Sequence, residues 1–82
     1  MEEMKEYLGL NPCSCGGKVV MMSEKAYFGI YCGYRLCNYS AFVICKGCHK
    51  VTAKFQIQGT ENEQDWHDVM LRAKNIWNQY HT

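Results

Sequence analysis

Six cysteines in a chain of 82 residues constrain the possible folds more than any other feature of the sequence. They form three close pairs, which are Cys13 with Cys15, Cys32 with Cys37, and Cys45 with Cys48. A domain of this size buries only about 60–65% of the surface of its unfolded chain. It therefore often needs a metal ion, disulfides or a second subunit for stability. The cysteine count predicts one cross-linked domain that spans residues 1–82.

The N-terminus favours a metal over disulfides. The first six residues are mostly acidic and polar, and no apolar segment follows that could serve as a secretory signal. The longest apolar run lies near residues 41–45, which is too short to cross a membrane. We therefore expect a cytoplasmic protein without membrane contact, in which thiols stay reduced and paired cysteines bind a metal, Zn²⁺.

Spacing selects the most favourable zinc ligands. Zinc takes four thiolate or imidazole ligands in a tetrahedron, and two cysteines within one tight turn can both reach the ion. The first choice is one ion held by the first and third pairs, Cys13, Cys15, Cys45 and Cys48. The remaining pair leaves alternatives open. Cys32 and Cys37 could replace the first pair, bind a second ion with His49, or be buried as small apolar residues.

The motif content does not indicate catalysis. Four cysteine ligands close the coordination shell of zinc and leave no position for a reacting water molecule. The sequence has no His-x-Glu, His-Glu-x-x-His or phosphate-binding P-loop motif. We therefore predict a structural zinc ion in a protein that is not an enzyme. A redox role for the middle cysteine pair is a weaker alternative.

Hydrophobic periodicity predicts an α+β fold. Residues 18–58 are rich in Val, Ile, Tyr, Phe and Thr, and they contain four candidate strands: Lys18–Met22, Tyr27–Tyr31, Tyr39–Cys45 and Val51–Ile57. These strands predict a small antiparallel, zinc-ribbon-like sheet over residues 12–58. Before the sheet, residues 1–11 are expected to form an arm with a short helix over residues 2–8, which Asn11-Pro12 ends.

A C-terminal amphipathic helix is predicted over residues 60–80. Apolar side chains recur at helical spacing and form one stripe that would pack on the sheet, namely Trp66, Val69, Met70, Ala73, Ile76, Trp77 and Tyr80. Thr60 and Glu63 have the spacing of a capping box, with Thr60 as the N-cap. Acidic residues gather near this end, where the helix dipole favours negative charge.

Positive charge is concentrated in the middle of the chain. Residues 18–54 contain six Lys or Arg residues against Glu24 alone, whereas both ends are mildly acidic. Basic residues interleaved with aromatic ones are typical of single-strand nucleic-acid binders, so a nucleic-acid-binding zinc ribbon is one hypothesis. The pI of about 7.6 counts against it, because such domains usually have a pI above about 9.

Three segments carry a resemblance to a known family. Leu10–Gly17 looks like the opening L-K-P-C-P-x-C-G-G of that family. Phe42–Cys48 looks like its aromatic-apolar strand running into C-x-x-C, and Ala73–Asn78 looks like its C-terminal A-x-x-x-W-N helix. The chain thus resembles the phage-encoded restriction alleviation (Lar-like) zinc ribbons. The resemblance implies a phage or prophage origin and an action against host defence inside the bacterial cell.

The chain departs from the family pattern in three places. The first cysteine pair has one intervening residue instead of two, and His49 stands where the family has a glycine. The interval between the two family cysteine pairs is also longer. An insertion near residues 23–38 explains this interval, and it offers a new binding surface.

The leading hypothesis is a non-catalytic inhibitor that binds a bacterial defence nuclease, either a CRISPR or a restriction enzyme. Tyrosine and arginine are enriched at the hot spots of protein interfaces, and the predicted insertion is rich in both. The residues predicted to bind the partner are Tyr27, Tyr31, Tyr34, Arg35, Lys46 and Lys50.

Overall fold

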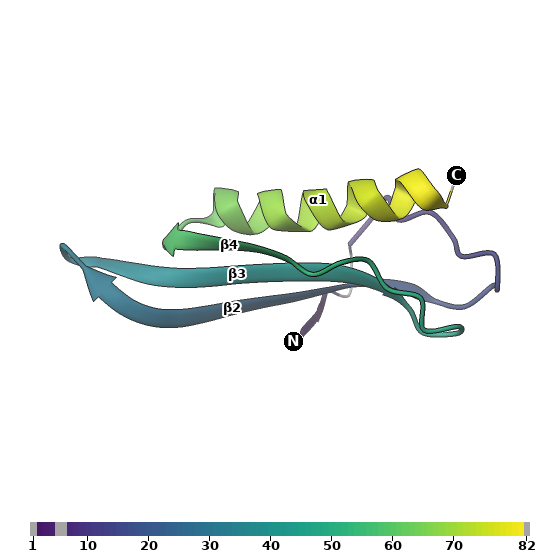
Figure 1. Ribbon diagram of the computed structural model, residues 1–82, viewed down its shortest axis with the longest axis horizontal. Helices are drawn as coiled ribbons and strands as arrows, with labels where there is room; N and C mark the ends of the chain where they lie inside the picture. Colours follow the sequence, from purple (N-terminus) through teal and green to yellow (C-terminus); the bar gives the residue numbers. More distant parts are fainter. Residues whose placement is uncertain (1, 5–6, 82) are drawn as a thin grey trace.

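The computed structural model describes residues 2–4 and 7–81. It has four strands and one helix, which are β1 (Glu2–Met4), β2 (Val19–Tyr31), β3 (Tyr34–Cys45), β4 (Phe55–Thr60) and α1 (Glu63–Tyr80). The strands form one antiparallel sheet in the order β1-β2-β3-β4. The helix lies along one face of this sheet (Figure 1). The predicted α+β architecture, an antiparallel sheet packed against a C-terminal helix, is confirmed.

The predicted N-terminal helix is wrong. Glu2–Met4 is a strand that pairs with residues 21–23 of β2, and residues 7–11 are neither helix nor strand. Residues 5 and 6 of the predicted helix lie outside the described residues. A helix of seven residues is marginal because its first turn is costly to form. By pairing with the edge of β2 instead, this short segment forms backbone hydrogen bonds without the cost of starting a helix.

The two central strands form one long hairpin. The separate strands predicted at 18–22 and 27–31 are a single strand, β2, with a bulge between Tyr27 and Gly29. At the tip, Cys32 and Gly33 both have positive φ, 51° and 80°, as a type I′ hairpin turn requires. The predicted insertion near residues 23–38 is therefore the outer half of this hairpin. Residues 36–38 still pair with β4, and the tip extends beyond α1 and β4 (Figure 1).

The core lies between the sheet and α1. Side chains of one sheet face, including Met21, Tyr39 and Val43, pack with buried residues of the helix. On α1 these buried residues are Val69, Met70, Ala73 and Trp77, which confirms most of the predicted stripe. Trp66 and Ile76 are half-buried, whereas Tyr80 is exposed because the sheet does not extend beneath it.

The strand predicted at 51–57 begins later than expected. Val51 makes one isolated bridge to Ile44, and regular pairing of β4 with β3 starts only at Phe55. Phe55 and Ile57 pack against the core as their alternation predicts. Val51 and Ala53 are exposed instead, because the chain leaves the ladder between them and Phe55.

The N-cap of α1 is Asn62, so the predicted cap at Thr60 is wrong by two residues. The Asn62 side-chain oxygen accepts a hydrogen bond from the amide of Asp65 at 2.8 Å. Thr60 is still part of β4 and contributes its carbonyl oxygen, which accepts from the Asn62 side-chain amide at 2.9 Å. Glu63 and Asp65 lie in the first turn, where negative charge stabilises a helix. Among the described residues, no helix is long and apolar enough to cross a membrane.

This cap predicts a difference between two neighbouring substitutions. Asn62→Ala removes the acceptor for the Asp65 amide and should lower the free energy of unfolding by about 1 kcal/mol. Thr60→Ala keeps the backbone carbonyl that accepts from the Asn62 side chain. It should change the free energy of unfolding by less than about 0.5 kcal/mol. Urea unfolding of the zinc-loaded variants measures both values. Equal losses of unfolding free energy in the two variants would contradict the assignment of Asn62 as the N-cap.

Candidate metal centre

Four cysteines meet at the end of the hairpin opposite its tip. Cys13 and Cys15 belong to the segment before β2, which we call the first knuckle (residues 13–17). Cys45 is the last residue of β3, and with Cys48 it forms the second knuckle (residues 45–48). All four sulfur atoms lie within 4.8 Å of one another. The structure therefore brings together the four cysteines that spacing favoured.

The sulfur distances fit a metal ion rather than disulfides. The Sγ atoms of Cys13 and Cys48 are 3.5 Å apart, and those of Cys15 and Cys45 are 3.3 Å apart. A disulfide requires about 2.05 Å, and all six cysteines are free. Four sulfurs around zinc in a tetrahedron, each about 2.3 Å from the ion, lie roughly 3.8 Å from one another. The four-cysteine cluster thus points to a metal ion, and its all-sulfur donor set favours zinc.

Backbone amides in the knuckles stabilise thiolate charge. The amide of Cys48, together with that of Gly47, lowers the pKa of Cys45 to about 6. The amide of Cys15 likewise lowers the pKa of Cys13. Gly17 donates a hydrogen bond to Cys15 at 3.3 Å, yet the sulfurs of Cys45 and Cys13 raise the pKa of Cys15 to about 11. Thiolates this close repel one another, and a divalent cation removes that repulsion.

Two glycines allow the knuckles to approach closely. A Cβ atom at Gly17 would lie 2.6 Å from the Gly47 Cα, and one at Gly47 would lie 2.8 Å from the Gly17 Cα. Such distances are far below van der Waals contact, so only glycine fits at either position. Next to this contact, the Lys46 amide donates to the Lys18 carbonyl at 2.8 Å and extends the β2–β3 pairing into the knuckles. The importance of Gly17 could not be read from cysteine spacing.

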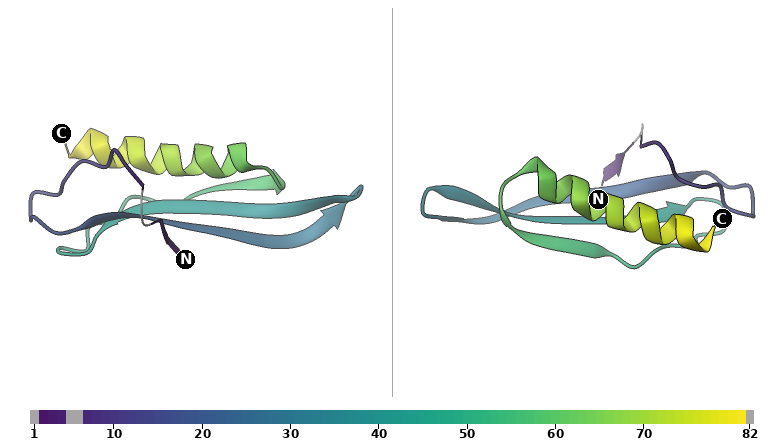
Figure 2. Two further views of the ribbon diagram at one scale, coloured as in Figure 1. Left: turned by 180° about the vertical axis from the view of Figure 1, so that it is seen from behind. Right: turned by 90° about the horizontal axis from the view of Figure 1, so that it is seen from above.

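The C-terminal end of α1 fixes the segment that leads into the first knuckle. The Trp77 indole donates to the Asn11 carbonyl at 2.9 Å, and the Asn78 side chain bonds both the Asn11 amide and the Gly9 carbonyl at 2.8 Å. Figure 2 shows this segment passing beside the end of the helix. The Trp77-Asn78 pair, noted in the sequence as part of a family pattern, therefore positions the first two cysteines.

The middle cysteine pair lies far from the cluster. Cys37 is fully buried in the core, eight residues before Cys45 along β3 and hence about 26 Å away. Cys32 is exposed in the turn at the tip, farther still. Neither can join the four-cysteine site. The suggestion that this pair is buried as small apolar residues is confirmed for Cys37 and is wrong for Cys32, which lies in the exposed turn.

His49 follows the second knuckle but is not part of the sulfur cluster. Its backbone has a φ of 63°, and its amide donates to the Cys45 carbonyl at 2.9 Å. Glycine adopts this left-handed conformation most readily. The position that departs from the family pattern thus keeps the backbone shape that a glycine would have there.

The residues predicted to bind a partner lie at two ends of a molecule that is 48 Å long. Tyr31 and Tyr34 pair with each other at the hairpin tip, Arg35 directly follows in the next pair, and Tyr27 lies farther toward the middle of the hairpin. Lys46 and Lys50 lie at the knuckle end instead. Lys46 forms an ion pair with Glu3 of β1. The two groups therefore do not form one continuous surface.

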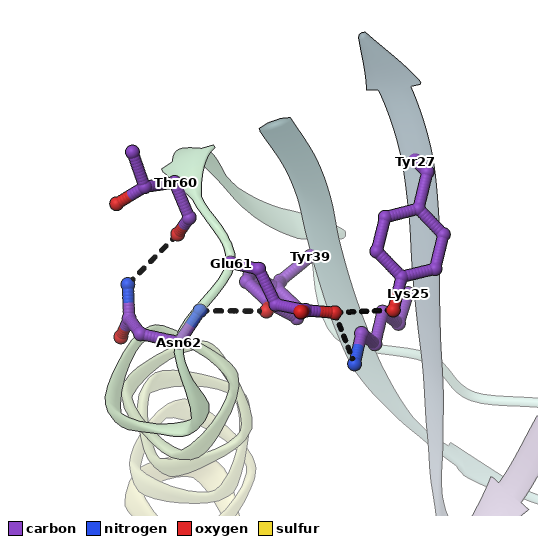
Figure 3. Close-up of polar contacts among 6 residues, drawn as sticks. All are labelled: Lys25, Tyr27, Tyr39, Thr60, Glu61 and Asn62. Carbon is purple, nitrogen blue, oxygen red and sulfur yellow. Dashed lines mark hydrogen bonds and ion pairs between the residues drawn. The ribbon is translucent and has the colours of Figure 1, made fainter. Parts of the chain in front are cut away.

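A polar cluster anchors the middle of the hairpin to the start of the helix. The Glu61 carboxylate accepts a hydrogen bond from the Tyr27 hydroxyl and pairs with Lys25 at 2.9 Å (Figure 3). The hydrogen bond from Tyr27, followed by that from Lys25, lowers the pKa of Glu61. Asn62 donates its amide to the Tyr39 hydroxyl at 3.0 Å (Figure 3). This cluster was not predicted, because its members come from three separate elements.

The four-cysteine cluster predicts one zinc ion per chain and a clear ranking of cysteine substitutions. Cys13→Ser and Cys45→Ser should each lose most bound zinc, because three thiolates leave the tetrahedron open. Cys32→Ser should keep the full zinc content, because Cys32 lies at the far end of the hairpin. Zinc measured per mole of purified protein tests this, and loss of zinc in Cys32→Ser would contradict the site.

The glycine contact predicts loss of zinc without any change of a ligand. Gly17→Ala places a methyl group against the Gly47 backbone, so the knuckles must separate and zinc affinity should fall by at least tenfold, about 1.4 kcal/mol. Gly59→Ala is the matched control, because the nearest atom to its Cβ is 3.8 Å away. Competition with a chromophoric chelator measures both affinities. Equal affinities would show that the close approach is not needed.

Comparison with known proteins returns no relatives: no family model matches the chain, and neither a curated protein nor a solved structure is similar to it. What remains of the predicted resemblance is its coarser part. The protein has a four-cysteine cluster on a small antiparallel sheet, as zinc-ribbon-like domains have.

Proposed function

We propose that this protein is a non-catalytic binding module in which zinc is structural and the hairpin tip contacts a partner protein. The observation that carries the proposal is the exposure of large apolar side chains on the projecting part of the hairpin. Ile30 is 75% exposed, Tyr31 68% and Tyr34 65%, and Phe28 is exposed beside them. Contiguous exposed apolar side chains of this kind mark interaction sites in soluble proteins.

Zinc supports this function without taking part in chemistry. Cys13, Cys15, Cys45 and Cys48 would fill all four positions of the ion, so none is left for a substrate or a water molecule. When bound, the ion supplies folding free energy that a core of this size lacks. It holds the two strands together at the end of the hairpin opposite the exposed side chains.

The part of the hairpin just below its tip is held by several contacts, which favours tight binding at the tip. Tyr27 is fixed by its hydrogen bond to Glu61, and the Arg35 guanidinium lies over the Tyr27 ring at 5.3 Å. The Glu61 amide also donates to the Arg35 carbonyl at 2.8 Å. A surface that is ordered before binding loses less conformational entropy when the complex forms.

The proposed partner is a bacterial defence nuclease, of the CRISPR or restriction class. This part of the proposal rests on the sequence resemblance to phage restriction alleviation proteins. The protein would inhibit by covering a surface that the nuclease needs, in the manner of a small protein inhibitor.

Nucleic acid is the second candidate partner, and one observation favours it. Lys18, Lys50 and Lys54 are exposed on the knuckle half of the molecule, away from the apolar tip. Binding there would be electrostatic. Its affinity should fall by about one log unit per log unit of salt for each phosphate contact.

A double substitution at the tip tests the leading proposal. Tyr34→Ala with Arg35→Ala removes two hot-spot side chains and should weaken inhibition of plasmid cleavage by a purified restriction or CRISPR nuclease at least tenfold. The matched control is Tyr80→Ala, which removes an exposed tyrosine from the C-terminal end of α1.

Two results would overturn this proposal. The first is unchanged inhibition by the double variant. The second is binding to labelled single-stranded DNA that depends steeply on salt and is lost in Lys50→Glu, which would favour the nucleic-acid alternative. Zinc content, measured on each variant, reports that the fold is intact.

A further inference from the structure

The sheet face opposite α1 carries an apolar cluster. In the antiparallel register, Met22 lies beside Phe42 and Val20 beside Ile44, and Ile44 bridges to Val51. Paired residues of neighbouring strands point to the same face. The core residues Met21 and Val43 point toward α1, so these five side chains point away from it. We call them the back-face cluster.

Val20 of this cluster is buried at 5% exposure, whereas no described element of the chain covers the other four side chains. The helix lies only on the other side of the sheet (Figure 1). Met22, Phe42 and Ile44 are only half-buried, and with Lys46 and His49 they line a shallow hollow. Val51 is 57% exposed. Side chains of the apolar type therefore face solvent in the isolated chain.

The sequence pattern of these strands indicates burial on both faces. Residues 19–22 and 41–45 are apolar at every position. A strand with one face in water alternates apolar and polar residues, whereas a strand buried on both faces is apolar throughout. Residues 55–58 of β4 show the alternating pattern, Phe-Gln-Ile-Gln. The knuckle half of β2 and β3 thus has the composition of strands that lie between two layers.

The charges that flank the cluster identify the missing layer. Val20, Met22 and Glu24 alternate along β2 and lie on the same face. Lys18 directly precedes β2, and because its carbonyl still pairs with the Lys46 amide, it continues this alternation at the other end of the cluster. Both charged residues are exposed, and neither has an ionic partner within the described part of the chain. Lys46 also lines this face, but it forms an ion pair with Glu3. The back face therefore has a positive end at Lys18 and a negative end at Glu24. It is complementary to a second copy of itself that runs in the opposite direction.

We propose that the back-face cluster is the interface of a homodimer. A two-fold axis lying across the strands sets β2 antiparallel to β2 of the second copy, with the two clusters packed against each other. Lys18 of each copy then lies opposite Glu24 of the other, giving two equivalent ion pairs, as an isologous interface requires.

Charge reversal tests the arrangement in the zinc-loaded protein. Sedimentation velocity over a concentration series should give a dimer for the wild type. Lys18→Glu or Glu24→Lys alone replaces two attractive pairs by two repulsive ones and should raise the dissociation constant about 100-fold. The double variant Lys18→Glu/Glu24→Lys restores opposite charges and should return to within about threefold of the wild-type value. The matched control is Arg72→Glu, the same change of charge on the exposed side of α1.

Substitution at the centre of the face provides a second test. Phe42→Asp should give a monomer that still binds one zinc ion, whereas Leu71→Asp on the exposed side of α1 should remain a dimer. If Phe42→Asp fails to fold, the charge-reversal variants still decide, because all of them change exposed residues. Wild-type protein that stays monomeric up to about 1 mM overturns the proposal. A double charge variant as weak as the single ones also overturns it.

These outcomes are separate from those of the proposed function. Tyr34→Ala/Arg35→Ala should lose inhibition and remain a dimer, because the hairpin tip lies beyond the back-face cluster. A dimer that is lost in this variant but kept in Lys18→Glu would place the interface at the tip and overturn the proposal.

Discussion

The close contact between the backbones of Gly17 and Gly47 is the constraint on which the rest of the structure depends. It brings the two knuckles at the open end of the β2–β3 hairpin, one before β2 and one after β3, within reach of one ion, so that four sulfurs lie within 4.8 Å. The hairpin is therefore closed twice, by its turn at Cys32-Gly33 and by the metal centre at its open end. A two-stranded ribbon is marginally stable by itself, which explains why the long ribbon needs this second closure.

The C-terminal helix connects the metal centre to the core. Trp77 is buried against the sheet, and its indole also holds the backbone at Asn11, two residues before the first cysteine. Packing of the helix and the position of the first knuckle are thus coupled through one side chain. At the other end of α1, Glu61 and Asn62 contact Lys25 and Tyr39 and fix the middle of the hairpin. One helix therefore supports both the metal centre and the middle of the ribbon.

This arrangement frees two surfaces for binding. The metal and the helix stabilise the fold from one end and from one face. The aromatic hairpin tip and the apolar back face remain exposed. The first surface is a projection and suits a hollow on a different protein. The second is a shallow hollow with one unpaired charge at each end, which suits the proposed pairing with a second copy. A small domain can present both because its stability does not depend on covering either one.

Much of the metal centre could be predicted from the sequence, because ligand chemistry is local. Cysteines one or two residues apart within a turn can chelate an ion, and the structure brings the predicted Cys13, Cys15, Cys45 and Cys48 together. The helical stripe was equally readable, because its period of 3.6 residues depends only on neighbours along the chain. The sequence analysis assigned the N-cap to Thr60 instead of Asn62, because Asn and Thr are both good caps. Only the position at which β4 ends decides between them.

Local patterns therefore determined the strand character of residues 19–57, the C-terminal helix with its apolar face, and the four-cysteine set. Tertiary structure alone decided that residues 2–4 pair as a strand, that the apparent insertion is the outer half of one hairpin, and that two glycines meet between the knuckles. It also decided that most apolar side chains on the second face of the sheet have no covering layer among residues 2–4 and 7–81. The physical reason is that these features are contacts between segments distant in sequence, whose free energy depends on which surfaces meet and not on the propensity of either segment.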